Sequence, residues 1–165
     1  MNKHSIVNIV FMVIGLVFFP GCKPELSIDY DAVERANREG ITVTFQGDAC
    51  EIDGPDVLLV GEYHFILNDI SQISNADLFV SKLTDGHTYQ DLIDPQTTPG
   101  EYYPKPYWVV YATKETMVDS TTGQRSYDIK LESGEYAIYV YGLTESAEKW
   151  LWFCLPITVL DKPNG

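Results

Sequence analysis

The chain has 165 residues, of which 45% are hydrophobic and 21% are charged, so it can form one packed domain and is not disordered throughout. Acidic residues outnumber basic ones by 24 to 11, and the resulting formal net charge of −13 argues against nucleic acid as a partner. Tyrosine accounts for 11 residues and favours β structure, because it packs well on a pleated surface.

Residues 1–21 have the pattern of a lipoprotein signal peptide. Lys3 precedes an apolar run at 6–19, which as a helix would span roughly 21 Å and fall short of the ~30 Å hydrocarbon core of a bilayer. The run ends in Phe-Pro-Gly before Cys22, which resembles a lipobox, the motif whose cysteine is acylated and becomes the new N-terminus. We therefore expect palmitate-type lipidation of Cys22 and an extracytoplasmic domain anchored to the cell membrane or the outer membrane. An uncleaved N-terminal anchor is the alternative, and it also places 23–165 outside the cytoplasm.

Removal of the signal peptide makes the chain more acidic. The remainder carries 24 acidic and 10 basic residues, a net charge of −14. Adsorption to anionic lipid is disfavoured for such a surface, so we expect membrane attachment through the N-terminal lipid alone. The charge favours solubility, and attraction of cations is the alternative interpretation.

Two cysteines remain once Cys22 is lipidated. In an oxidising compartment, Cys50 and Cys154 are predicted to form a disulfide. The closed loop of about 105 residues would stabilise the fold by up to ~4–5 kcal/mol in the chain-entropy model.

The elements of the mature chain are predicted in order. Residues 22–40 form a tether with a short helix at 31–39, which ends at Gly40. A domain at 41–162 follows, with short strands separated by turn signals, a pattern typical of an antiparallel sandwich. Thr88 and Asp91 have capping-box spacing and predict a helical insertion that ends at Pro95, before a loop at 95–106. The expected strands are 41–45, 51–52, 57–60, 62–67, 77–83, 107–113, 127–131, 136–141 and one or two within 150–160, where Pro156 predicts a bend or an edge.

The order and spacing of these segments resemble the cupredoxin-like β-sandwich, in its exported form. The matching segments are 43–45, 53–67, 78–93, 107–110, 127–141 and 155–160. The most specific match is Leu131-x-x-Gly134-x-Tyr136, which resembles the Gly-x-Tyr corner before the metal-ligand loop of blue-copper proteins. The resemblance implies an all-β cupredoxin-like sandwich with one short helical insertion.

The ligands of a blue-copper centre are missing from the positions that the resemblance implies. Such a centre needs two histidines, a thiolate and a weak axial ligand. The first histidine position holds Ala76 and Asp77, the cysteine position holds Val140, and the second histidine position holds Leu143. The axial position lies near Glu148, and no methionine follows Met117. We therefore expect no copper site and no cofactor.

Other candidate sites have simple structural explanations. His64 lies in a strand and is expected on a sheet face. Asp85, His87 and Asp91 could hold a divalent ion weakly, but turn and cap roles explain them as well. The acidic group of Asp48, Glu51, Asp53 and Asp56 matches no known calcium loop and fits a solvated turn. No hydrolase, metalloprotease, P-loop or dinucleotide motif is present, and we expect no enzymatic activity.

The remaining feature is a group of aromatic residues. Tyr102, Tyr103, Tyr107 and Trp108 crowd one loop and strand entry, and they form either core or an exposed binding patch. We expect a non-catalytic binding or envelope-interaction module with an unidentified protein or glycan partner. A non-blue metal-handling protein that uses acidic side chains and His87 is the alternative function.

Overall fold

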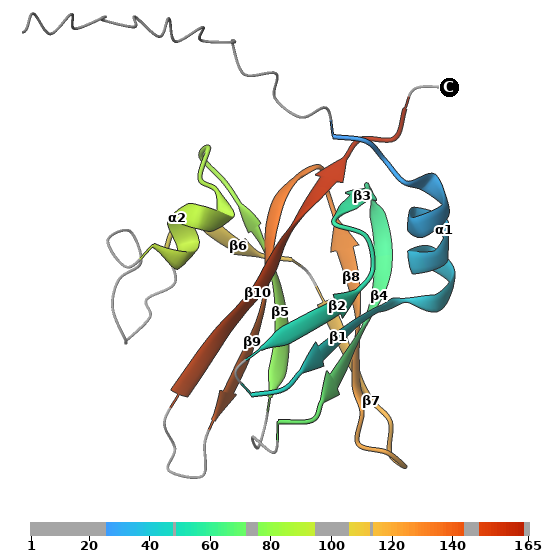
Figure 1. The fold of residues 1–165 in the computed structure, drawn as a ribbon, viewed down its shortest axis with the longest axis vertical. Coiled ribbons are helices and arrows are strands. Elements are labelled where there is room, and N and C mark those ends of the chain that lie inside the picture. Colours follow the sequence, from blue (N-terminus) through green and yellow to red (C-terminus); the bar gives the residue numbers. More distant parts are fainter. Residues whose placement is uncertain are drawn as a thin grey trace, which may run out of the picture.

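Two five-stranded sheets form the protein in a computed structural model that describes residues 26–47, 49–71, 76–94, 106–112, 114–143 and 149–163 (Figure 1). Side chains are described for all of these except 143 and 149–152. The signal peptide and Cys22 lie outside the described residues. No helix in the described part of the chain is both long and apolar enough to cross a membrane.

The first sheet has the order β2-β1-β4-β8-β7 and the second has the order β3-β10-β9-β5-β6. The strands of the first are β1 (Ile41–Phe45), β2 (Cys50–Asp53), β4 (Gly61–Asp69), β7 (Lys114–Val118) and β8 (Arg125–Leu131). Those of the second are β3 (Val57–Leu59), β5 (Asp77–Leu83), β6 (Val109–Tyr111), β9 (Gly134–Leu143) and β10 (Lys149–Leu160). Parallel pairing joins β1 to β4 and β3 to β10, and the other neighbours are antiparallel. The predicted all-β sandwich is confirmed at this level, although its pairing is mixed.

Alternation along the strands places the core between the sheets. In β1, Ile41, Val43 and Phe45 are buried while the two threonines between them are half-buried. In β9, Tyr136, Ile138 and Val140 belong to this core, and Ala137 and Tyr139 belong to a second cluster on the other face. This division of the strand into two faces follows from the period-2 geometry of a strand.

Helix α1 (Tyr30–Glu39) covers part of the first sheet. Asp29 caps it through Oδ1, which accepts from the Ala32 N–H at 3.0 Å. Buried Ala32, Val33 and Ala36 face the sheet, and the helix contacts β4 and β3. The helix ends at Gly40, whose φ of 87° and close approach to the His64 carbonyl leave no space for a side chain. The predicted helix is confirmed, and it packs on the domain although it was expected within the tether.

Helix α2 (Tyr89–Ile93) is the predicted insertion. Thr88 Oγ1 accepts from the Asp91 N–H, and the Asp91 carboxylate accepts from the Thr88 N–H at 2.8 Å, so the predicted capping box is present. Leu92 is buried, and α2 packs on β9 and β10 on the outer face of the second sheet.

Two tyrosine hydroxyls brace the crossings between the sheets. Tyr63 in β4 donates to the Leu59 carbonyl at 2.8 Å and accepts from its N–H at 3.2 Å. Tyr136 in β9 makes the same two bonds to Glu132, both at 3.0 Å. The hexapeptide Leu-x-x-Gly-Glu-Tyr occurs at both crossings, at 58–63 and 131–136. Sequence reasoning finds only the second corner, because a repeat of six residues is too short to indicate an internal duplication.

Strand β7 was not predicted, and β10 continues through Pro156. In β10 the proline lies opposite Ala137 of β9, after a register shift between Phe153 and Leu155, and pairing with β3 begins only at Thr158. Proline has no N–H to donate, and at Pro156 that position faces the side of β10 on which no strand is paired yet. This agrees with the predicted bend or edge.

Candidate functional site

Three polar side chains from both sheets meet at the start of β5. Tyr127 in β8 donates a hydrogen bond to Asp77 Oδ1 at 2.7 Å, and its oxygen accepts from the Leu78 N–H at 3.3 Å. Lys114 Nζ lies 3.2 Å from both oxygens of Asp77 and donates to the Leu78 carbonyl at 2.9 Å. We call Asp77, Lys114 and Tyr127 the β5 polar cluster. It joins β5 of one sheet to β7 and β8 of the other.

The Lys114 ammonium also lies over two aromatic rings. Its Nζ is 4.3 Å from the centre of the Phe79 ring and 4.7 Å from that of Tyr127, which are cation–π distances. The Tyr127 side chain is fully buried, and burial together with the Asp77 carboxylate raises the pKa of its phenol well above the ordinary value. Tyr127 therefore stays protonated and acts as a hydrogen-bond donor, while Lys114 supplies the positive charge of the cluster.

The β5 polar cluster lies at the end where the family resemblance implies metal ligands. Register pairs Asp77 with Tyr141 and Leu78 with Val140, so the first histidine position and the cysteine position are brought side by side. Those positions hold Asp77, with Ala76 before it, and Val140. The side chain at 143 and residue Glu148 lie outside the description. In this chain a lysine ammonium, rather than a ligand set, faces Asp77.

An aromatic cluster extends from the β5 polar cluster over the outer face of the second sheet. Phe79 stacks on Tyr139 with ring centres 5.5 Å apart, and it contacts Tyr111 at 5.5 Å and Tyr141 edge-on at 6.4 Å. Tyr139 also contacts Phe153, and its hydroxyl bonds to Ser81 Oγ at 3.0 Å. These rings are buried or half-buried beside α2, so most of this cluster is core.

The predicted aromatic patch is only partly as expected. Tyr107 is 81% exposed. Trp108 is 5% exposed and stacks on His87 with ring centres 4.3 Å apart, so for this candidate patch residue the core alternative holds and the patch alternative does not. The cause is α2, since Trp108 joins the cluster of Leu83, Leu92 and Tyr139 beneath that helix. Tyr102 and Tyr103 lie outside the described residues.

A different set of exposed apolar side chains follows Tyr107 along the chain. Val110 and Tyr111 in β6 are 46% and 50% exposed, and Met117 and Val118 in β7 are 41% and 60% exposed. We call these four residues together with Tyr107 the edge surface. It follows β6 and β7, the terminal strands of the two sheets, and within each strand its two neighbouring side chains point to opposite faces. Sequence reasoning missed β7 because Lys-Glu-Thr-Met-Val has no apolar alternation.

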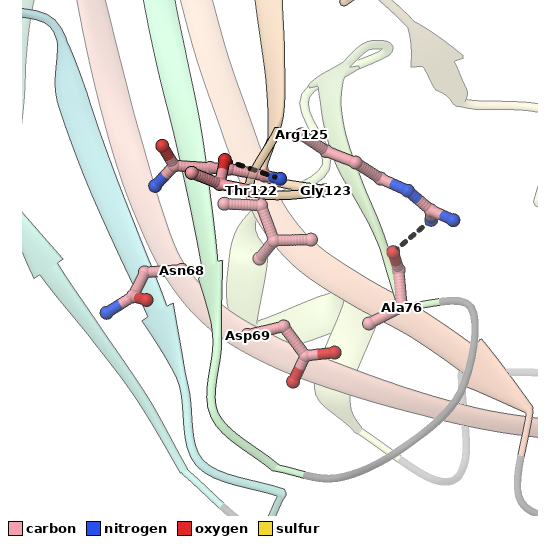
Figure 2. A pocket seen from close by; sticks show the side chains of 8 residues that line it. Asn68, Asp69, Ala76, Thr122, Gly123 and Arg125 are labelled. Carbon is pink, nitrogen blue, oxygen red and sulfur yellow. Dashed lines mark hydrogen bonds between the residues drawn. The ribbon is translucent and has the colours of Figure 1, made fainter. Parts of the chain in front are cut away.

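A cleft of about 480 Å³ opens between the end of β4, the β7–β8 turn and the start of β5 (Figure 2). Its lining residues are Leu67, Asn68, Asp69, Ala76, Thr122, Gly123, Gln124 and Arg125. The Arg125 guanidinium donates to the Ala76 carbonyl. No sequence signal indicates this cleft, because residues 67–69 and 76 and residues 122–125, which form its walls, are at least 46 residues apart in the chain.

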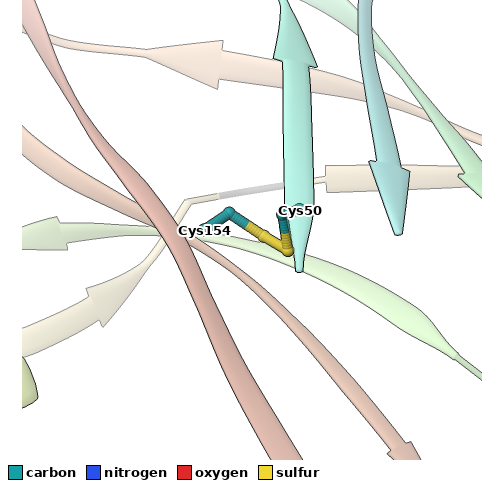
Figure 3. The surroundings of a disulfide bond; sticks show 2 residues. All are labelled: Cys50 and Cys154. Carbon is teal, nitrogen blue, oxygen red and sulfur yellow. A yellow bond between two sulfur atoms is a disulfide. The ribbon is translucent and has the colours of Figure 1, made fainter. Parts of the chain in front are cut away.

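The disulfide predicted between Cys50 and Cys154 is present (Figure 3). It joins β2 in the first sheet to β10 in the second, with the two Cα atoms 5.1 Å apart. Because these strands belong to opposite sheets, the bond links the two layers across the core.

The described residues contain no group of three His, Cys, Asp or Glu side chains that could hold a metal ion. His64 Nδ1 bonds to Asp128 at 2.8 Å on the outer face of the first sheet. His87 Nδ1 is 3.8 Å from Asp91 Oδ2, and that oxygen already accepts from Thr88. Glu51, Asp53 and Asp56 are exposed, and Asp48 lies outside the described residues.

Comparison with known proteins does not assign a family, since no protein-family model, curated protein or solved structure matches the chain.

Proposed function

We propose that this protein is a lipid-anchored, extracytoplasmic and non-catalytic cupredoxin-like module that binds a partner through the edge surface. The apolar run before Cys22 supports the anchor. The corner at Tyr136, together with the order of the matching segments, supports the cupredoxin-like assignment. Neither of these two observations identifies a partner.

The observation that carries the binding proposal is where the exposed apolar side chains lie. The five residues of the edge surface fall within twelve consecutive positions, four of them on the last strand of a sheet and Tyr107 in the turn before β6. Soluble proteins protect such strands with charged side chains, particularly lysine. Of the two charged side chains of β7, Lys114 turns inward onto Asp77 and is only 22% exposed, so Glu115 is the one exposed charge on this strand.

The geometry of the edge surface favours a protein over a glycan as the partner. Within the described residues β7 pairs with β8 on one side only, so its other side offers backbone groups to an incoming strand. An extended polypeptide can pair with those groups in a regular ladder, which a glycan cannot, and the exposed Tyr, Val and Met side chains supply apolar contacts beside them. The net charge of −13 further favours a basic partner segment.

Site-specific photocrosslinking in the cells that produce the protein tests this proposal. A photoreactive residue is placed at Tyr107 or Val118, with Tyr30 and Ile70 as matched controls, because these are 52% and 58% exposed on other parts of the surface. We expect one discrete protein adduct from the two edge positions and none from the controls. The proposal is wrong if all four positions give the same adducts, or if the edge positions give none.

The anchor is tested separately by the mass of the mature protein. We expect the chain to begin at Cys22 and to carry acyl groups, and we expect Cys22→Ala to remain uncleaved and unacylated. An unmodified Met1 in the wild-type protein would contradict the lipoprotein assignment without affecting the edge surface.

A further inference from the structure

The cleft in Figure 2 holds charges of both signs that are not paired with each other. Arg125 lies at the start of β8 and Asp69 at the end of β4, and both line the cleft. Among the described residues, neither forms an ion pair within 4.0 Å with the other or with any other group. In a chain with 24 acidic residues, a half-buried arginine without a carboxylate partner in the described structure needs an explanation.

Within the described residues, the Arg125 guanidinium has more donors than partners. A guanidinium carries five N–H donors, and the Ala76 carbonyl accepts from one of its terminal nitrogens. This single bond fixes the side chain beside the start of β5. The remaining donors form a planar fork suited to binding a carboxylate in two places.

Asp69 provides the opposite charge. Its Oδ1 accepts from the Ser71 N–H at 3.0 Å and from the Ser71 hydroxyl at 2.6 Å, which fixes the carboxylate at the end of β4. Asn68 and Gln124, which carry neutral amides, line the same cleft. The cleft therefore offers an anion, a cation and neutral hydrogen-bonding groups among its lining residues.

We infer that this cleft binds a small zwitterion, either an α-amino acid or a short peptide. Arg125 takes the carboxylate and Asp69 takes the ammonium group. A simple anion would meet the Asp69 carboxylate and the negative field of the whole protein, and a simple cation would meet Arg125. A volume of about 480 Å³ lies within the range of small-molecule sites, which is about 300 to 1,000 Å³.

The cleft lies away from the N-terminal end of the described chain. The described chain begins beside the C-terminal end of β10, whereas the β7–β8 turn and the end of β4 lie at the opposite end of the sandwich (Figure 1). The elements that line the cleft therefore lie at the end of the sandwich opposite the start of the described chain. This inference does not depend on the edge surface, and either proposal can fail alone.

Calorimetric titration of the purified mature protein with defined probes tests the inference. The probes are L-alanine and the dipeptide Ala-Ala as zwitterions, N-acetyl-alanine as the anion and alaninamide as the cation. We expect one of the two zwitterions to bind at one equivalent and each single-charge analogue to bind about tenfold more weakly or worse. Which zwitterion binds distinguishes a free amino acid from a peptide. Binding of N-acetyl-alanine as tightly as the zwitterions would overturn the inference, as would no binding of either zwitterion.

Two variants locate the site. We expect Arg125→Gln and Asp69→Asn each to weaken zwitterion binding about tenfold, because each removes one charge-assisted contact. Arg38→Gln, on the exposed surface of α1, is the matched control and should bind as the wild type does. Asp69 is exposed, so we expect Asp69→Asn to fold. This variant therefore tests the site even if Arg125→Gln loses the bond to Ala76 and disturbs the sandwich. Unchanged binding by Asp69→Asn would place the ligand elsewhere and refute the proposed site.

Discussion

The Tyr127 hydroxyl donates to Asp77 Oδ1 at 2.7 Å, from β8 of one sheet to the first residue of β5 in the other. The same oxygen accepts from the Leu78 N–H, and Lys114 holds the carboxylate from β7. One side chain from each of three strands therefore joins the two sheets at the start of β5. This connection is polar, although the layers it joins are otherwise held together by apolar packing.

Removal of this hydroxyl should destabilise the protein without unfolding it. Tyr127→Phe keeps the buried ring but leaves the Leu78 N–H without its acceptor and Asp77 without one donor. We expect a loss of about 1 to 3 kcal/mol in the free energy of unfolding, measured by urea denaturation. Tyr30→Phe, at an exposed position of α1, should change it by less than about 0.5 kcal/mol. Equal effects of the two variants would show that the bond to Asp77 makes no net contribution to the free energy of unfolding.

The two corner tyrosines should give matched effects. Tyr63→Phe and Tyr136→Phe each remove a hydroxyl that donates to one carbonyl and accepts from one N–H of the same residue. We expect each variant to lose about 1 to 2 kcal/mol in urea denaturation. A cost confined to Tyr136→Phe would show that the two hexapeptides are alike in sequence but not in energetic role.

The sequence predicts the strands whose apolar residues alternate, because burial of one face against the other sheet is what defines them. Residues 41–45 and 77–83 match β1 and β5 at both ends. Strand β7 is missed for the same reason, since both of its faces are largely exposed and it has no pattern to read. The sequence leaves Trp108 between core and patch because its burial depends on α2, which meets it only in three dimensions.

The site is less predictable than the fold. The proposed resemblance draws attention to Asp77, but its partners Lys114 and Tyr127 come from strands 37 and 50 residues away. Arg125 and Asp69 reach one cleft through the β4–β8 pairing, which is set by register. The spacing of residues in the sequence does not predict such long-range contacts. Only the corner at Tyr136 and the capping box at Thr88 are local enough to be predicted from the sequence.

Copper should not be retained by the mature protein. Ala76 and Val140 supply no ligand atoms at two of the positions that the resemblance implies, and the Lys114 ammonium would repel a cation near Asp77. After incubation with copper and dialysis, we expect much less than one equivalent of metal by elemental analysis. One tightly held equivalent would favour the alternative function of metal handling. In that case loss of the metal in His87→Ala, but not in His64→Ala, would place the site at the α2 turn.

Reduction of the disulfide should cost more than any of the single hydrogen bonds. The bond closes a loop with a sequence separation of 104 and therefore restricts the unfolded chain strongly. The double variant Cys50→Ser/Cys154→Ser should lose up to about 4 to 5 kcal/mol, measured by urea denaturation. Wild-type protein under reducing conditions should match the variant. If reducing conditions destabilise the double variant as much as the wild type, the reductant itself causes the loss, and breaking the link between the sheets does not.

Alkaline pH should weaken the fold through its buried phenols. Burial raises the pKa values of Tyr63, Tyr89, Tyr127 and Tyr136 above the ordinary value of 10.0. Above that pH the unfolded chain loses protons that the folded protein retains, so the unfolded state binds fewer protons and stability falls as pH rises. The stabilisation is complete below about pH 10 and is lost progressively above it, as the pH approaches the raised pKa values.

Urea midpoints measured at about pH 8, 9, 10 and 11 check this dependence. We expect a constant midpoint up to about pH 9 and a steep fall above pH 10. Tyr127→Phe should start from a lower midpoint but fall less steeply, because its most strongly shifted phenol is gone. The Cys50→Ser/Cys154→Ser variant should keep the wild-type slope, which separates phenol ionisation from alkaline damage to the disulfide. An unchanged slope in Tyr127→Phe would mean that this phenol is already accessible to solvent in the folded protein.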